Sequence, residues 1–246
     1  KALWHAIHPE EDLIGSYARG AAHYRLAADE ATPQRIRYAH RLFGAYLAAT
    51  FSRRVVDKYP ELIFRVPFVK AVFPDAKFLF LVRNGWDTCH SIEGWSNRLG
   101  EQVGGETHDW WGVNRRKWHL LIEQLIPEHP DLAKHAEAMR GWTNHTDMAA
   151  VEWIVTMREG MALLDQYPDD VLRVTYEELC SDPRRMLGNM TDFLGLPAND
   201  GPFLYYGEET LRPVVAKKSF MLASSIEGAF LETMQVLGYK GTPSNS

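Results

Sequence analysis

The sequence predicts an α/β fold in which a parallel sheet is flanked by helices and much of the chain is helical. Residues 78–82 form an unbroken apolar run, Phe-Leu-Phe-Leu-Val, which is typical of a parallel strand covered on both faces. Residues 171–176 are rich in β-branched and aromatic side chains, which also favours a strand. Between these two segments, residues 148–167 have the amphipathic spacing of a long helix.

The remaining helices and loops are predicted from the helical spacing of apolar residues and from Gly and Pro residues that end or begin helices. Residues 1 to about 57 have mainly helical spacing, and Thr32-Pro33 matches an N-cap followed by Pro at the first helical position. Gly195 and Pro197 give a clear helix stop. We expect further short helices over 62–69, 120–126, 131–139, 183–194 and from 219 to 237, loops over 94–105 and 198–216, and a disordered tail over 241–246.

Composition and charge restrict the classes of protein. The 246 residues are 46% hydrophobic and 24% charged, which suits one folded domain over residues 1–246. The net charge of −5 argues against a surface that binds nucleic acid throughout. No apolar run approaches the roughly 18 residues of a membrane span. The two cysteines have no metal-like or redox-like spacing, so we expect a cytoplasmic protein without a metal.

The candidate binding site begins where the first predicted strand ends. Arg83 follows the apolar run directly, and Asn84 and Gly85 suit a tight turn into a helix. In open α/β sheets ligands bind beyond the carboxyl ends of the strands, often against a helix N-terminus that favours anions. Arg83 offers a fork of donors there, and Ser91 lies about two helical turns further on. The residues alone leave open an anion site or a solvated arginine.

Residues 73–91, from Phe-Pro-Asp-Ala-Lys to Ser91, closely resemble the strand–turn–helix that binds the 3′-phosphate in the sulfotransferase family. This resemblance implies a P-loop-like fold and the donor 3′-phosphoadenosine 5′-phosphosulfate (PAPS), with adenosine 3′,5′-diphosphate (PAP) as the product. It implies that Arg83 and Ser91 bind the 3′-phosphate. The acidic residue that usually follows the arginine is Asn84 in this chain, which is a mild departure.

Two further segments resemble the same family. Lys58-x-Pro60 is similar to an element whose lysine lies beside the sulfuryl group that is transferred, whereas the alternative is a surface lysine. Residues 171–183 and Phe193 to Pro197 resemble the late strand–helix unit, in which Tyr176 would contact the adenine or simply pack on the core. A basic loop closes over the nucleotide in the family, which implies phosphate binding by Lys217 or Lys218.

An aromatic and basic segment over residues 107–118 is a candidate acceptor site. Trp110, Trp111 and Trp118 flank three basic residues, a pattern that also occurs in surfaces that stack nucleic acid. Given the overall negative charge, we favour an acceptor-side flap or plain packing. Aromatic faces suit a partly apolar or sugar-bearing acceptor.

Two family elements are missing from the sequence. No Gly-rich phosphate loop lies between a strand and a helix, and we expect that loop upstream of Lys1. The catalytic base is not marked by any family pattern either. The candidates near the chain start are His8, which we select, and His5, Glu10 and Glu11.

These observations together predict transfer of a sulfuryl group from PAPS to a hydroxyl or amine of a small-molecule, lipid or glycan acceptor, with Lys58 and His8 as catalytic residues. Two alternatives remain open. A small-molecule kinase of P-loop type would need a strand-end carboxylate for Mg²⁺, where this chain has Arg83. A non-catalytic nucleotide-binding module is the other.

Overall fold

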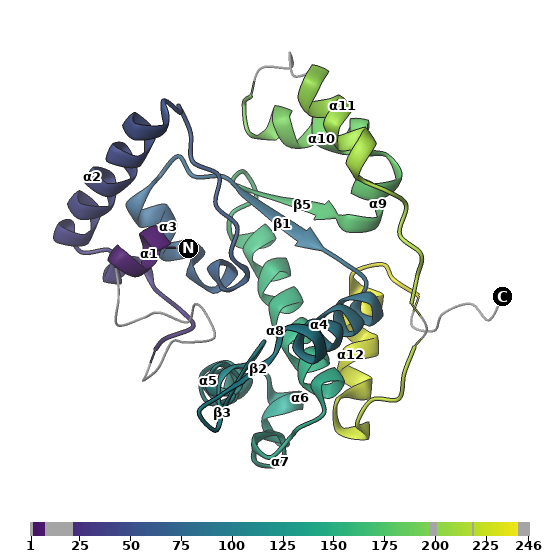
Figure 1. Cartoon of the computed structure of the whole chain (residues 1–246). Coiled ribbons are helices and arrows are strands. Elements are labelled where there is room, and N and C mark those ends of the chain that lie inside the picture. The colour runs from purple at the N-terminus through teal and green to yellow at the C-terminus, as the bar shows by residue number, and fades with distance from the viewer. Residues whose placement is uncertain (1, 8–21, 197–200, 218, 241–246) are drawn as a thin grey trace. The chain divides into compact units, whose positions relative to one another are not determined.

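The computed structural model describes residues 2–7, 22–196, 201–217 and 219–240 (Figure 1). The chain divides into two compact units, which are described separately. The first unit comprises residues 1–76 and 95–141, and the second comprises residues 77–94 and 142–246. Our expectation of one domain over residues 1–246 stays a prediction.

The first unit is mainly helical. Its N-terminal half packs around Trp4, whose ring centroid lies 5.1 Å from that of Phe43 and 6.2 Å from that of Phe73. Thr32 caps the longest helix by accepting a hydrogen bond from the backbone N–H of Arg35, as the Thr-Pro pair predicts. The helices are α1 (Ala2–Ile7), η2 (Ala28–Glu30), α2 (Pro33–Thr50), η3 (Pro60–Arg65), α3 (Val66–Val72), α5 (Arg116–Gln124), η4 (Ile126–Glu128), α6 (Pro130–Ala133) and α7 (Ala136–Arg140).

A small antiparallel sheet replaces the loop that we expected over residues 94–105. Helix α4 (Gly85–Leu99) continues through most of that segment, and β2 (Glu101–Val103) then pairs with β3 (Glu106–Asp109), which pairs with β4 (Gly112–Val113). Gly104 and Gly105 join β2 to β3 and both have positive φ, 58° and 86°. Two adjacent residues of this kind form the tight hairpin turn that right-twisted strands favour. The loop prediction was therefore wrong.

The second unit is built on two parallel strands. β1 (Phe78–Val82) pairs with β5 (Val171–Thr175), as Figure 1 shows. In this register Val82 lies opposite Thr175. This confirms the predicted parallel sheet and both strands. The helices of the unit are the first part of α4, α8 (His145–Gln166), α9 (Tyr176–Ser181), α10 (Pro183–Phe193), α11 (Gly201–Thr210) and α12 (Ser224–Val236). The loop that we expected over residues 198–216 therefore contains a helix.

Helix α8 lies unusually close to β1. A Cβ atom at Gly160 would overlap the ring of Phe80, so only glycine fits at this crossing. Phe80 and Val82 are buried, whereas Leu79 and Leu81 on the opposite face of the strand are 36% and 47% exposed. The expectation that β1 is covered on both faces is thus not met by the residues that the structure describes.

Within the described ranges, none of the helices combines the length and the apolar composition that a bilayer crossing requires.

Candidate functional site

Arg83 and Tyr176 lie next to each other at the carboxyl edge of the sheet. Because Val82 pairs with Thr175, the residue that follows each strand emerges at the same edge. The guanidinium carbon of Arg83 lies 4.8 Å from the centroid of the Tyr176 ring, in a cation–π arrangement. The structure thus brings together two of the predicted site residues.

Arg83 is a cation for which the described part of the chain provides no counter-ion. It is partly exposed, and it forms no ion pair with any residue that the structure describes. Its Nε atom is buried and has no hydrogen-bond partner among those residues. A buried donor without an acceptor costs free energy, so such a group marks a site where a ligand supplies the acceptor. An anion of suitable shape meets this requirement.

The main chain at Arg83 is held in place from the opposite side. The indole Nε1 of Trp153, on α8, donates a hydrogen bond of 3.0 Å to the carbonyl oxygen of Arg83. Trp153 also packs on Phe230 of α12, with ring centroids 4.9 Å apart. These contacts fix the backbone from which the guanidinium projects.

The N-terminus of α4 is already satisfied within the protein. Oδ1 of Asn84 accepts hydrogen bonds from the backbone N–H groups of Trp86 and Asp87, at 2.9 and 3.4 Å. The N–H of Gly85 faces the sulfur of Met234, at 3.3 Å. We expected this helix N-terminus to favour an anion. The first backbone donors are in fact used internally, so the donors left for an anion at this edge are side chains.

Glu177 is the carboxylate that follows Tyr176, and its two oxygens are both engaged. Oε1 accepts a hydrogen bond of 2.9 Å from the backbone N–H of Asn84, and Oε2 accepts one of 2.7 Å from the hydroxyl of Tyr239. Burial and the hydrogen bond to Glu177 raise the pKa of Tyr239 well above its usual range. These two bonds hold the carboxylate to Asn84 and Tyr239, and no ion pair joins it to Arg83.

The hydroxyl of Tyr176 is also engaged. A hydrogen bond with the thiol of Cys180 and partial burial raise the pKa of Tyr176. The tyrosine is therefore neutral near pH 7, and it offers the faces of its ring as a binding surface.

A segment near the C-terminus is fastened to the start of α4. Asp87 is only 2% exposed, and its Oδ1 accepts a hydrogen bond of 2.6 Å from the backbone N–H of Lys217. The ring of Phe220 lies 5.0 Å from the rings of both Trp86 and His90. This segment brings the exposed Lys217 to the helix that carries Ser91, which is itself exposed on α4. Lys218 lies outside the described residues.

The other predicted residues belong to the first unit or are not described. Lys58 is exposed, and its backbone N–H donates to Oδ1 of Asp57. His8 lies outside the described residues. Trp111 is completely buried and packs on Trp118 with ring centroids 5.6 Å apart, which supports the packing alternative. Trp110 is half-buried.

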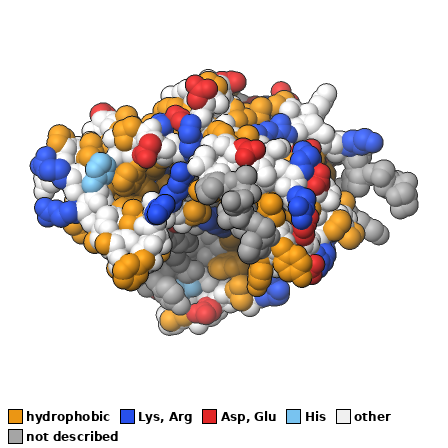
Figure 2. All heavy atoms as spheres, turned by 90° about the horizontal axis from the view of Figure 1, so that it is seen from above, with side chains coloured by type: hydrophobic (Ala, Val, Ile, Leu, Met, Phe, Trp, Pro, Cys, Tyr) orange, Lys and Arg blue, Asp and Glu red, His pale blue; other side chains and the backbone are white. Residues whose placement is uncertain are grey.

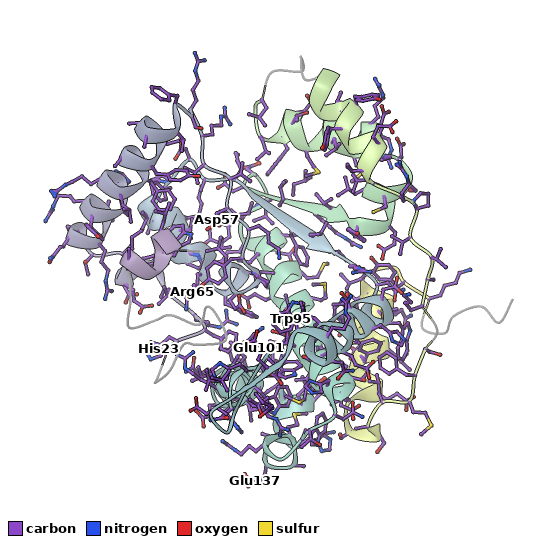
Figure 3. The ribbon with its side chains drawn as sticks, viewed as in Figure 1. His23, Asp57, Arg65, Trp95, Glu101 and Glu137 are labelled. Atoms are coloured by element: carbon purple, nitrogen blue, oxygen red, sulfur yellow. The ribbon has the colours of Figure 1, made fainter. Side chains whose placement is uncertain are left out.

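Trp110 stands in an aromatic and charged cluster that also includes Trp95 and Glu61, which the sequence pattern did not indicate. Its ring lies 5.7 Å from that of Trp95 and 4.6 Å from Nζ of Lys117. Lys117 is buried and forms an ion pair of 3.1 Å with the buried Glu61. Arg65, four residues after Glu61, is also buried, and it donates hydrogen bonds to the carbonyl oxygens of His23 and Tyr24. Figure 3 labels Arg65, His23 and Trp95.

Sequence reasoning missed the residues that support Arg83. None of Asp87, Trp153, Glu177 and Phe220 was assigned a role, although Asp87 and Glu177 stand within the two stretches that resemble the family. No group of three or more His, Cys, Asp or Glu side chains in the described part of the chain is arranged to hold a metal ion.

Comparison with known proteins gives one family match and one structural match. The model described as "Sulfotransferase family" matches residues 16–129 and 129–200. A search among curated proteins found no match. Among solved structures, "Sulfotransferase Domain from the Curacin Biosynthetic Pathway" is 16% identical with a TM-score of 0.49, and the match covers 83% of this chain and 69% of that one.

Proposed function

Because the chain belongs to the sulfotransferase family, we propose that it transfers a sulfuryl group from PAPS to a hydroxyl or amine of a small-molecule, lipid or glycan acceptor. One observation carries the choice of donor. Arg83 is a strand-end cation whose buried Nε has no partner among the described residues, and the 3′-phosphate of PAPS provides the missing acceptor oxygens.

Four residues of the second unit and one undescribed neighbour would hold the donor. Arg83 and Ser91 bind the 3′-phosphate, since a guanidinium fork matches phosphate oxygens and a serine hydroxyl adds one donor. Tyr176 offers its ring to the adenine. Lys217 and its neighbour Lys218 supply charge from the segment that Asp87 fastens to α4. This assignment agrees with the contacts of Arg83 and Asp87.

PAPS supplies a sulfuryl group on a good leaving group when it is bound. The acceptor oxygen or nitrogen forms a new bond to sulfur while the bond from sulfur to the 5′-phosphate oxygen breaks, and the acceptor proton passes to a base. In our proposal His8 is that base. Lys58 stabilises negative charge on the transferring group and on the departing phosphate oxygen. Anchoring by Arg83 fixes the direction of displacement.

The acceptor would contact the half-buried Trp110, whose ring offers flat apolar area. Trp111 is fully buried, so it would pack in the core rather than contact the acceptor.

Ligand-induced thermal stabilisation of the full-length protein tests the proposal. Adenosine 3′,5′-diphosphate, 5′-AMP and ATP are compared at equal concentration. At about 100 times its Kd, a ligand that binds only the folded state adds roughly 2.7 kcal/mol, which is readily measured. We expect stabilisation only by the 3′-phosphorylated nucleotide. Equal stabilisation by ATP, or none by any of the three, would contradict the proposal and favour the kinase or a non-catalytic module.

A further inference from the structure

Helix α2 and the segment that follows it form a strongly basic region on a negatively charged protein. Residues 33–58 contain six Lys and Arg residues but one acidic residue, whereas the whole chain has 27 basic and 32 acidic residues. Helix α2 itself contains no Asp or Glu. The region thus has a local charge opposite in sign to that of the whole chain. We name as the α2 surface the side chains Arg37, Tyr38, Arg41, Phe51, Arg53 and Val56.

The exposed face of α2 is both basic and aromatic. Only Ala39 and Phe43 of this 18-residue helix are buried. Arg37, Tyr38 and Arg41 lie within about a third of the helix circumference on the opposite side, at 3.6 residues per turn, and all three are exposed. Figure 2 shows Lys and Arg side chains beside hydrophobic ones at its left end, where α2 lies.

The segment after α2 projects apolar side chains into solvent. Phe51 ends the helix in a left-handed conformation, with φ of 53°, and is 96% exposed. Val56 is 91% exposed, and the exposed Arg53 lies between them in sequence. Two large apolar side chains are thus almost fully exposed to water in the segment that follows the basic helix.

Asp57, the acidic residue of the region, is engaged by hydrogen bonds. Oδ2 of Asp57 accepts a hydrogen bond of 2.7 Å from the indole of Trp4, and Oδ1 accepts one from the backbone N–H of Lys58. Among the described residues, Arg37, Arg41 and Arg53 form no ion pair. These three charges are therefore exposed to solvent and accessible to an anionic partner.

We infer that the α2 surface binds the anionic surface of a lipid bilayer. Basic side chains are attracted to acidic headgroups within about 10 Å, the Debye length at 0.1 M salt, and aromatic and aliphatic side chains insert at the headgroup level. A bilayer is deformable, so it accommodates exposed apolar side chains such as Phe51 and Val56 without the shape-matched patch that a protein partner would require. This inference does not depend on the proposed enzymatic activity.

Vesicle flotation of the full-length protein tests the inference. Phosphatidylcholine vesicles with and without phosphatidylserine are compared, and soluble polyglutamate serves as an acidic competitor. We expect binding only to vesicles that contain phosphatidylserine, with at least about a tenfold loss when the salt is raised well above 0.1 M. Absence of such binding, or binding of polyglutamate in preference to vesicles, would overturn the inference.

Two variants with matched controls identify the residues. Arg37→Glu/Arg41→Glu should lower vesicle binding at least about tenfold, because each reversal replaces attraction by repulsion. Phe51→Asn should lower it about fivefold and keep the fold, since asparagine accepts a left-handed helix end. Lys134→Glu/Lys240→Glu makes the same charge change elsewhere, and Met221→Asn removes another fully exposed apolar side chain. Equal loss with the controls would also overturn the inference; thermal unfolding confirms that each variant folds.

Discussion

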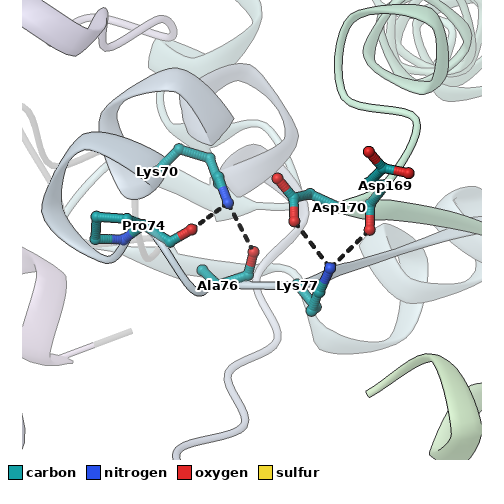
Figure 4. A network of polar contacts seen from close by, with 6 residues as sticks. All are labelled: Lys70, Pro74, Ala76, Lys77, Asp169 and Asp170. Atoms are coloured by element: carbon teal, nitrogen blue, oxygen red, sulfur yellow. Dashed lines mark hydrogen bonds and ion pairs between the residues drawn. The ribbon is translucent and has the colours of Figure 1, made fainter. Parts of the chain in front are cut away.

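A basic residue lies at each end of the β1–β5 pair, and the two differ in whether an acidic side chain neutralises them. At the amino ends, Nζ of Lys77 is paired with the carboxylate of Asp170 at 3.0 Å and with the carbonyl oxygen of Asp169 at 2.7 Å (Figure 4). At the carboxyl ends, Arg83 has a neighbouring carboxylate, Glu177, but that carboxylate is bound to other partners. Five residues of one strand thus separate a neutralised cation from an uncompensated one.

This contrast distinguishes a structural charge from a functional one. A lysine that closes a turn is satisfied within the protein, and its contribution to stability is small because the pair is partly exposed. An arginine whose neighbouring acid is directed elsewhere is unfavourable for the isolated fold but prepared for a ligand. The four predictions below test the contrast, in order of decreasing effect.

Arg83→Ala should weaken binding of adenosine 3′,5′-diphosphate by about 10- to 150-fold, since a hydrogen bond to a charged group contributes roughly 1.5–3 kcal/mol. The free energy of unfolding without ligand should change little or increase. Isothermal titration calorimetry and denaturant unfolding measure the two quantities. Arg83→Lys is the matched control, because it keeps the charge but loses the fork, and it should restore part of the affinity. Unchanged affinity in Arg83→Ala would remove this residue from the site.

Asp87→Ala should weaken nucleotide binding by about 5- to 30-fold, because the N–H of Lys217 loses its buried acceptor and the segment with Lys217 is released from α4. Asp87→Asn keeps an acceptor oxygen and should recover most of the affinity. Limited proteolysis within residues 211–223, with and without nucleotide, reports release directly. If both variants lost affinity equally, the charge of Asp87 and not its hydrogen bond would matter.

Tyr239→Phe should cost about 1 kcal/mol of stability at pH 7, the usual net contribution of one hydrogen bond. It should also free an oxygen of Glu177 to compete for Arg83, and so lower nucleotide affinity a few-fold. Because the folded state raises the pKa of Tyr239, the stabilisation is complete below about pH 10, the ordinary tyrosine pKa, and declines as the pH rises above it. Urea unfolding at pH 7 and above pH 10 should show a shallower alkaline decline in the variant. Equal declines would refute the assignment.

Lys77→Ala should reduce stability by less than about 1 kcal/mol, as expected for a partly exposed ion pair. Its nucleotide affinity should equal that of the unaltered protein. This variant is the reference for Arg83→Ala, since both remove a cation next to β1. A loss of affinity comparable to that of Arg83→Ala would abolish the distinction between the two ends of the sheet.

The sequence predicts the centre of this site because its signals are local. The apolar run of β1 and the β-branched run of β5 identify the strands, and parallel pairing necessarily brings Arg83 and Tyr176 to one edge. The family resemblance of residues 73–91 agrees with the family match of the chain. The assignment of individual residues to PAPS stays a prediction.

The surroundings of the site are not predictable from sequence, because they depend on long-range packing. Trp153 and Tyr239 reach the site from helices and turns that are distant in sequence, and no spacing rule connects them to Arg83. The hairpin at Gly104 and Gly105 is different. The pair of glycines is a recognised turn signal, and we misread it because the flanking strands are short and polar.

The two buried cysteines allow local opening of the helices to be measured by chemical modification. The chain has two cysteines, Cys89 on α4 and Cys180 on α9, and both are free and buried. Burial raises the pKa of the Cys89 thiol, which suppresses its reactive thiolate. A thiol reagent can therefore modify Cys89 or Cys180 only when the surrounding helix opens. The rate of modification then reports how often that helix opens. Without any introduced label, alkylation kinetics followed by mass spectrometry would show whether a nucleotide closes the helix that follows Arg83 or the one that begins at Tyr176.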